Sequence, residues 1–145
     1  ATEEHSVPLC EKFDPALAGL RVDGIGWQAH IHVGWEENSL NMRRLKELIK
    51  WAHKNDLSFH VTEMNVWLDP ENLDYEAQAD TFAAVLKTLL GERDGGQVTW
   101  NTWNLSDATA WEKTRHKRGC IFFEDMSAKP AYYAIQNVLL EGAGD

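Results

Sequence analysis

The sequence predicts one α/β domain with parallel strands. Short β-branched, apolar segments alternate with longer segments in which apolar residues recur at the spacing of an amphipathic helix. Because the connections are short, this alternation predicts parallel strands joined by right-handed crossovers. No low-complexity segment or linker interrupts residues 1–145, so we expect a single domain.

The first strand–helix unit comprises a strand at about residues 22–30 and a helix at about residues 39–55. Asn38 or Ser39 suits the N-cap of this helix, because either side chain can accept a hydrogen bond from a free backbone N–H. The expected buried face of the helix consists of Leu45, Leu48, Ile49 and Ala52.

The second unit comprises a strand at about residues 57–66 and a helix at about residues 74–90, followed by Gly91 as an expected left-handed stop. The expected buried face of this helix consists of Phe82, Val85, Leu86 and Leu89. The third unit has a strand at about residues 97–105, a long polar loop, and a last helix that begins at Pro130 and runs to about Leu140.

Three parallel strands that are apolar on both faces do not close a core. A (β/α)₈ TIM barrel needs about 250 residues, and this chain has 145. We therefore expect the last three βα units of such a barrel, with residues 1–20 as the remnant of the preceding helix. A first residue other than Met indicates processing or excision from a longer chain. Open parallel edges favour association, so we also expect homo-oligomers.

Composition excludes several classes of partner. The net charge of −9 argues against nucleic acids and anionic membranes. No apolar run approaches the roughly 20 residues of a membrane span, and we expect neither a membrane span nor a signal peptide within residues 1–145. Cys10 and Cys120 lack the spacing of a zinc site, and one disulfide between them is compatible with the sequence but not implied by it.

Glu63 ends the apolar strand of the second unit, so it is expected at the carboxyl edge of the sheet, where such folds do their chemistry. A carboxylate there is costly to bury, although capping or an ion pair would also explain it. Seven tryptophans, five of them near predicted strand ends, suggest a flat-faced ligand such as a sugar. Trp51 and Trp100 are expected in the core instead.

Four motifs carry a family resemblance: GIGWQAH at residues 24–30, VTEMNV at 61–66, WNLSD at 103–107 with Trp111, and KPAYYA at 129–134. In this order and spacing they resemble glycoside hydrolase family 10, a family of endo-β-1,4-xylanases built on a (β/α)₈ barrel. The resemblance implies xylan or xylo-oligosaccharide as the substrate, no cofactor or metal, and an extracellular setting.

The resemblance also implies roles for residues. Glu63 matches the nucleophile of a retaining mechanism, and His30 matches the residue that contacts it. Gln28 matches a residue directed at the catalytic acid and counts with the substrate-binding residues. Trp103 and Trp111 match the aromatic platform of a sugar subsite. Asn65 stands where the family usually has Asp, and we place it with the substrate-binding residues.

Asn104 stands where the family has Gly, and the resemblance places the general acid/base Glu on a fourth barrel strand that this chain lacks. The remaining acids near the site in sequence, none of which matches the acid motif, are Glu36, Glu37, Glu124 and Asp125. Two hypotheses therefore stay open: a retaining xylanase with Glu63 as nucleophile, or a truncated fragment that binds xylan without cleaving it.

Overall fold

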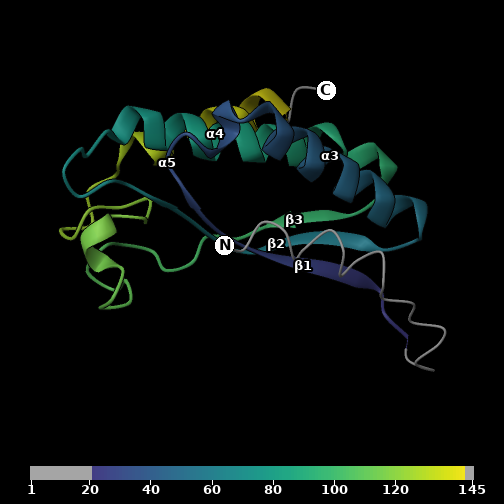
Figure 1. The fold of residues 1–145 in the computed structure, drawn as a ribbon, viewed down its shortest axis with the longest axis horizontal. Helices are drawn as coiled ribbons and strands as arrows, with labels where there is room; N and C mark the ends of the chain where they lie inside the picture. The colour runs from purple at the N-terminus through teal and green to yellow at the C-terminus, as the bar shows by residue number, and fades with distance from the viewer. Residues whose placement is uncertain (1–20, 143–145) are drawn as a thin grey trace.

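The computed structural model describes residues 21–142, which form a twisted parallel sheet with helices packed on one face (Figure 1). The strands are β1 (Gly24–His32), β2 (Ser58–Trp67) and β3 (Val98–Trp100), in the order β1-β2-β3. The helices are α3 (Ser39–Lys54), α4 (Tyr75–Gly91) and α5 (Pro130–Gly142). Short 3₁₀ turns occur at η1 (Trp35–Glu37), η2 (Arg93–Gly95) and η3 (Arg115–Lys117).

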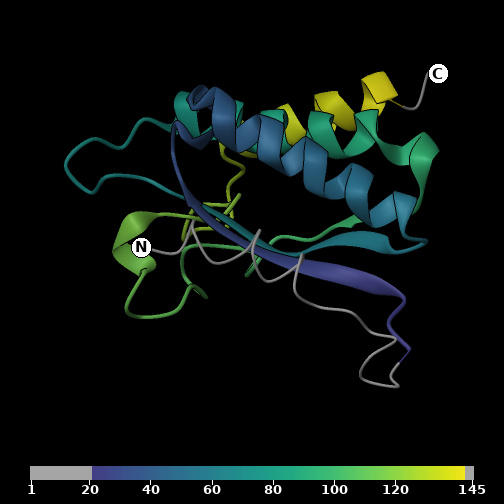
Figure 2. The ribbon, with the colours of Figure 1, turned by 45° about the vertical axis from the view of Figure 1, so that its right-hand side comes forward.

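The helices all lie on the same side of the sheet, as a second view confirms (Figure 2). Both strand pairs are parallel, so the predicted order of strand–helix units is confirmed. No other element of residues 21–142 covers the opposite face, which we call the open face. In a closed barrel this face would line the interior.

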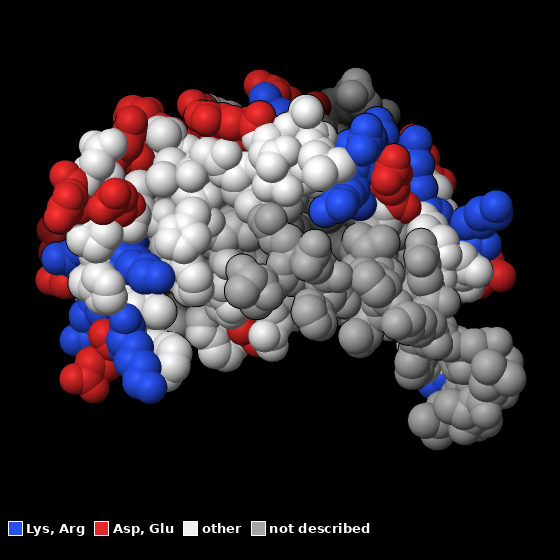
Figure 3. Space-filling view, in the orientation of Figure 1, with Lys and Arg blue, Asp and Glu red and all other residues white. Residues whose placement is uncertain are grey.

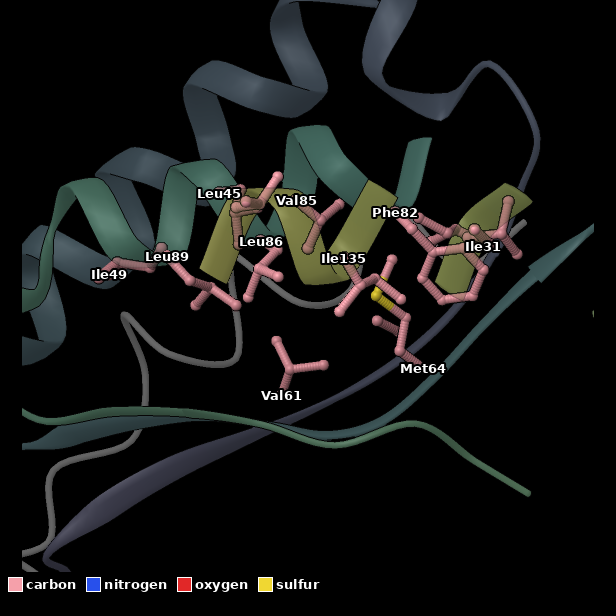
Figure 4. Close-up of a cluster of buried hydrophobic side chains, with 14 of the residues drawn as sticks. Ile31, Leu45, Ile49, Val61, Met64, Phe82, Val85, Leu86, Leu89 and Ile135 are labelled. Atoms are coloured by element: carbon pink, nitrogen blue, oxygen red, sulfur yellow. The ribbon is translucent and has the colours of Figure 1, made fainter. Parts of the chain in front are cut away.

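The core lies between the sheet and the helices (Figure 4). Phe59, Val61 and Met64 point from β2 toward the helices, and each is fully buried. The predicted apolar faces of α3 and α4 are confirmed, since their buried members are Leu45, Ile49, Ala52, Phe82, Val85, Leu86 and Leu89. Leu48, Trp51 and Trp100 pack against this core while only partly buried.

A bulge in β2 decides which face Glu63 occupies. Trp27 pairs with Val61, but the next residue of β1, Gln28, pairs with Glu63, so Thr62 is an extra residue in β2. Before the bulge the odd-numbered residues of β2 face the helices, and after it the even-numbered residues do, as the burial of Met64 shows. The bulge therefore turns Glu63 to the open face, the re-aiming that bulges provide beside functional sites.

The predicted third strand is wrong in its second half. Only Val98–Trp100 is strand, and Asn104 has a positive φ of 64°. Residues 101–103 still follow β2, since the N–H of Trp103 donates to the carbonyl of Met64 at 2.9 Å. Beyond Trp103 the end of β2 has a different neighbour, because the N–H of Val66 donates to the carbonyl of Gly119 at 3.2 Å. Asn104, which stands where the family has Gly, is thus the left-handed residue at which the chain leaves the sheet.

Two helix ends test the capping predictions. Asn38 is the N-cap of α3, with its side chain accepting from the N–H of Leu40 at 3.0 Å. The predicted left-handed stop at Gly91 is wrong, because Gly91 is the last residue of α4 and Glu92 caps it with φ of −111°. Gly34, at the start of η1, is the described glycine that adopts the left-handed conformation, with φ of 78°. No helix within residues 21–142 is long and apolar enough to span a membrane.

Candidate active site at the carboxyl edge of the sheet

Glu63 is bound by two side chains from the neighbouring strand. Gln28 donates from Nε2 to Oε1 of Glu63 at 2.9 Å, and Nε2 of His30 lies 2.9 Å from Oε2. Gln28 and His30 alternate along β1 and so share the open face, which brings both beside the carboxylate. The Glu63 side chain is 18% exposed. Each carboxylate oxygen therefore has one partner while the group still reaches solvent.

The Asn65 side chain is oriented by two backbone carbonyls. Its Nδ2 donates to the carbonyl oxygen of Trp103 at 2.7 Å and to that of Gly119 at 3.3 Å. A carbonyl oxygen only accepts, so the amide nitrogen has to face this pair. The amide oxygen Oδ1 is thereby directed at Nδ1 of His30, 3.2 Å away. Asn65 is only 6% exposed, and both of its polar atoms are engaged within the chain.

This orientation assigns the hydrogens of His30. Because Oδ1 of Asn65 is an acceptor, Nδ1 of His30 carries the hydrogen of their contact. Nε2 then carries a hydrogen only in the imidazolium form. The contact between Nε2 and Oε2 of Glu63 consequently holds one proton, on His30 or on Glu63. When the proton is on His30, Glu63 is an ionised carboxylate with a donor on each oxygen.

The tryptophans do not all gather at this edge. Trp27 and Trp35 contact each other at 5.5 Å between ring centroids and pack against the core. Trp67 lies parallel to His30 at 5.7 Å, and Lys117 lies 4.3 Å from its ring centroid. These three of the five tryptophans near predicted strand ends are therefore engaged within the protein.

Trp103 and Trp111 differ from those rings in exposure. Trp103 is 46% exposed and makes an edge contact with His30 at 6.5 Å, so it lies beside the Glu63 site. Trp111 is 60% exposed on the loop before η3, and its recorded ring contact is with Lys113 at 5.1 Å. Neither ring is packed in the core.

The acids considered as partners of Glu63 lie elsewhere in the chain and do not contact it. Glu124 pairs with Arg118, and hydrogen bonds from Ser127 lower the pKa of Asp125. Glu36 and Glu37 belong to η1, which packs against α4 on the helix side. Within residues 21–142 the recorded side-chain partners of Glu63 are Gln28 and His30, and no cluster of acids, His or Cys suits a metal ion.

The basic loop is partly a solvated segment. Figure 3 shows Lys and Arg atoms gathered at the lower left, where Figure 1 places the light-green loop with η3. Lys113, Arg115 and His116 are exposed, which suits the polar loop expected between the third strand and the last helix. Lys117 and Arg118 are half-buried, because Lys117 covers Trp67 and Arg118 pairs with Glu124.

A buried ion pair near the site was not predicted. Lys129 and Asp107 are both fully buried, with Nζ 2.7 Å from Oδ2. Burial lowers the pKa of Lys129, and Asp107 opposes that shift. Asp107 also accepts from the N–H of Cys120 and so satisfies a loop amide. Burial, with the Asp107 charge, raises the pKa of the Cys120 thiol to about 12. Cys10, its possible disulfide partner, lies outside the described residues.

Replacing Lys117 by Met should raise the pKa of His32, which lies beside Trp67. Burial lowers this pKa most, and the Lys117 charge lowers it further, so the variant should recover part of the shift. A lowered pKa means that the folded state binds fewer protons than the unfolded state, so this contribution to stability falls as pH drops below about 6.5. A proton NMR titration of His32 measures the change.

The matched control for that titration is Lys113→Met, which removes the same charge from the same loop without being a cause of the His32 shift. An unchanged His32 midpoint in the Lys117 variant, or an equal rise in the control, would contradict the assignment.

The whole chain was compared with known families and proteins. The family model for glycosyl hydrolase family 10 matches residues 4–138. Endo-1,4-beta-xylanase B of Thermotoga neapolitana is 26% identical over 132 residues, which cover 85% of this chain and 36% of that protein. The chain therefore spans about a third of the length of this relative.

Solved structures show the same fold. The xylanase 10B chain of Clostridium thermocellum superposes with a TM-score of 0.72 at 23% identity, covering 90% of this chain and 25% of that one. Native xylanase 10B of Thermotoga maritima gives a TM-score of 0.64 at 25% identity, covering 87% of this chain and 39% of that one. The prediction of a partial (β/α)₈ barrel is thereby confirmed, and the match over residues 4–138 shows that the chain belongs to glycosyl hydrolase family 10.

Proposed function

We propose that this chain carries the nucleophile half of a retaining endo-β-1,4-xylanase site, with Glu63 as the nucleophile. The observation that carries the proposal is the pair of nitrogen partners on Glu63, Nε2 of Gln28 at Oε1 and Nε2 of His30 at Oε2, each at 2.9 Å. With the proton of the His30 contact on the ring, Glu63 is the ionised carboxylate, which is the form that attacks a carbon centre.

In the proposed reaction one carboxylate oxygen of Glu63 attacks the anomeric carbon, and the bond from that carbon to the leaving oxygen breaks. The leaving oxygen takes a proton from a second carboxyl group, about 5–5.5 Å from the first in retaining enzymes. Water then cleaves the glycosyl–enzyme ester after giving its proton to the same carboxyl, which restores Glu63. We assign the second carboxyl to a barrel strand beyond the three described here.

The proposed substrate is xylan or a xylo-oligosaccharide. Family relatives support this choice, since the Clostridium thermocellum structure contains xylohexaose and the Thermotoga petrophila xylanase structure contains xylobiose. Trp103 and Trp111 are proposed to stack on sugar rings, because both are exposed and aromatic faces pack against sugar C–H groups. The mechanism requires no cofactor. A polymer of this kind implies an extracellular site of action.

The proposal assigns Asn65 a different task from the sugar contact predicted from the resemblance. Both polar atoms of its amide are engaged, and its side chain is 6% exposed. One amide thus joins His30 to the Trp103 backbone. We assign Asn65 as a positioning residue for these groups.

Glu63→Ala tests the proposal, with release of dinitrophenol from a dinitrophenyl β-xylobioside and retention in a xylan affinity gel as the two measurements; this leaving group needs little help from the second carboxyl. The proposed function predicts that dinitrophenol release is lost while the far-ultraviolet circular dichroism spectrum is unchanged. Glu124→Ala is the matched control, since it removes an exposed carboxylate that pairs with Arg118. If the unmutated chain is retained by xylan without releasing dinitrophenol, the non-catalytic binding hypothesis replaces this one.

A further inference from the structure

We propose that three fully buried polar side chains are positioning residues for Glu63. We call Gln78, Asp107 and Lys129 the clamp, because all three bind the backbone of residues 118–120. The inference rests on the function proposed above, since it states how the chain holds that carboxylate and its partners in place.

The clamp approaches residues 118–120 from three parts of the chain. Gln78 of α4 donates from Nε2 to the carbonyl of Arg118 at 2.8 Å, and Lys129 donates from Nζ to the same oxygen at 2.7 Å. Asp107 accepts from the N–H of Cys120 at 3.1 Å and pairs with Lys129. The backbone on both sides of residue 119 is therefore fixed by buried hydrogen bonds.

The clamped segment touches the site directly. The carbonyl of Gly119 accepts from Nδ2 of Asn65 at 3.3 Å and from the N–H of Val66 at 3.2 Å. A Cβ at Gly119 would lie 2.6 Å from Trp67 and 3.2 Å from Asn65, so the backbone packs against both side chains. The amide oxygen of Asn65 in turn fixes Nδ1 of His30, and the other ring nitrogen of His30 binds Glu63.

A contribution to stability does not by itself explain why the three polar side chains of the clamp are buried. Burying charged and amide groups is costly unless they are fully bonded, and buried ion pairs are often no more stabilising than apolar residues of similar size. Gln78 also donates to the carbonyl of Val66 at 2.7 Å, so one amide ties the end of β2 to residue 118. The hydrogen bonds set where the Gly119 carbonyl lies, which apolar packing would leave less defined.

Gln78→Met tests the inference, because it keeps the length of the side chain and removes its donor. The readout is the pair of ring ¹⁵N chemical shifts of His30 in the full chain, which report the hydrogens on Nδ1 and Nε2. We expect these shifts to move toward values averaged over both tautomers, because Asn65 loses its fixed orientation. His60 is an internal reference, since its ring binds Ser58 and Thr99 at the other end of β2.

Thr81→Val is the matched control variant. Thr81 is fully buried on the same helix, but its hydroxyl accepts from the N–H of Gly34 and donates to the carbonyl of Ala77. We expect it to leave the His30 shifts unchanged. Unmoved His30 shifts in Gln78→Met, or an equal movement in Thr81→Val, would overturn the inference.

Gly119→Ala is the second variant and settles the question if Gln78→Met does not fold. It displaces residues 118–120 by contact with Trp67 and removes no polar side chain. The His30 shifts should move in it as well, and unmoved shifts would again overturn the inference. None of these measurements needs hydrolysis, so a failure of the proposed function is recognised separately by the Glu63 experiments.

Discussion

Replacing Lys129 by Met should lower the free energy of unfolding by about 3–5 kcal/mol, the usual cost of leaving one member of a buried ion pair without its partner. Asp107 would remain fully buried, with the N–H of Cys120 as its remaining recorded donor. The carbonyl of Arg118 would keep only the donor from Gln78. Urea unfolding followed by tryptophan fluorescence measures the change.

Two further variants serve as a control and a rescue for that measurement. Lys50→Met removes an exposed lysine whose nearest carboxylate oxygen is 4.0 Å away, so its effect should stay within about 1 kcal/mol. The double variant Asp107→Leu with Lys129→Met removes both charges and should recover most of the lost stability. If Lys129→Met is as stable as the unmutated chain, the pair is not buried as described.

Replacing Asn65 by Asp should destabilise the chain, although Asp is the residue that the family usually has there. A carboxylate oxygen would face the carbonyl oxygens of Trp103 and Gly119, which now accept at 2.7 and 3.3 Å. Leaving buried groups unpaired costs about 1–3 kcal/mol each, and more for a charge.

The loss should shrink as the pH falls, because a protonated carboxyl can donate to the Trp103 carbonyl as the amide does. Burial beside carbonyl oxygens should raise the pKa of the introduced carboxyl in the folded state. The folded variant should therefore be most stable in acid and should lose stability as the pH rises and this carboxyl ionises. Thermal unfolding between pH 4 and 8 tests this. Asn101→Asp, an exposed change of the same charge, is the control. A variant at Asn65 that is as stable as the unmutated chain at pH 8 would contradict the assigned orientation.

The strands, the helices and their order could be predicted because each depends on a pattern within a short stretch of sequence. Apolar spacing identified the buried faces of α3 and α4, and β-branched runs identified β1 and β2. The extent of the third strand was overestimated, because beyond Trp103 its place beside β2 is taken by residues 117–119, which lie farther along the chain. Pairing between distant segments leaves no periodic signal in either of them.

The face of the sheet on which Glu63 lies could not be predicted from the alternation of side chains along β2. Strict alternation from Val61 would direct Glu63 toward the helices, and the extra residue at Thr62 reverses this. The family motif placed Glu63 and His30 together without explaining how. Gln78 and Lys129 were missed, although a polar residue on the apolar face of α4 is a signal that a buried hydrogen bond is needed.

Covalent trapping tests the central claim, that Glu63 is a nucleophile. A dinitrophenyl 2-deoxy-2-fluoro-β-xylobioside has a leaving group that needs little help from a general acid, so the test does not depend on the second carboxyl. The fluorine slows hydrolysis of the glycosyl–enzyme ester, so the adduct accumulates. We expect mass spectrometry of the digested chain to find one fluoroxylobiosyl group on Glu63, and none in Glu63→Ala. Labelling of another carboxylate, or no labelling of a chain that binds the sugar, would contradict the account.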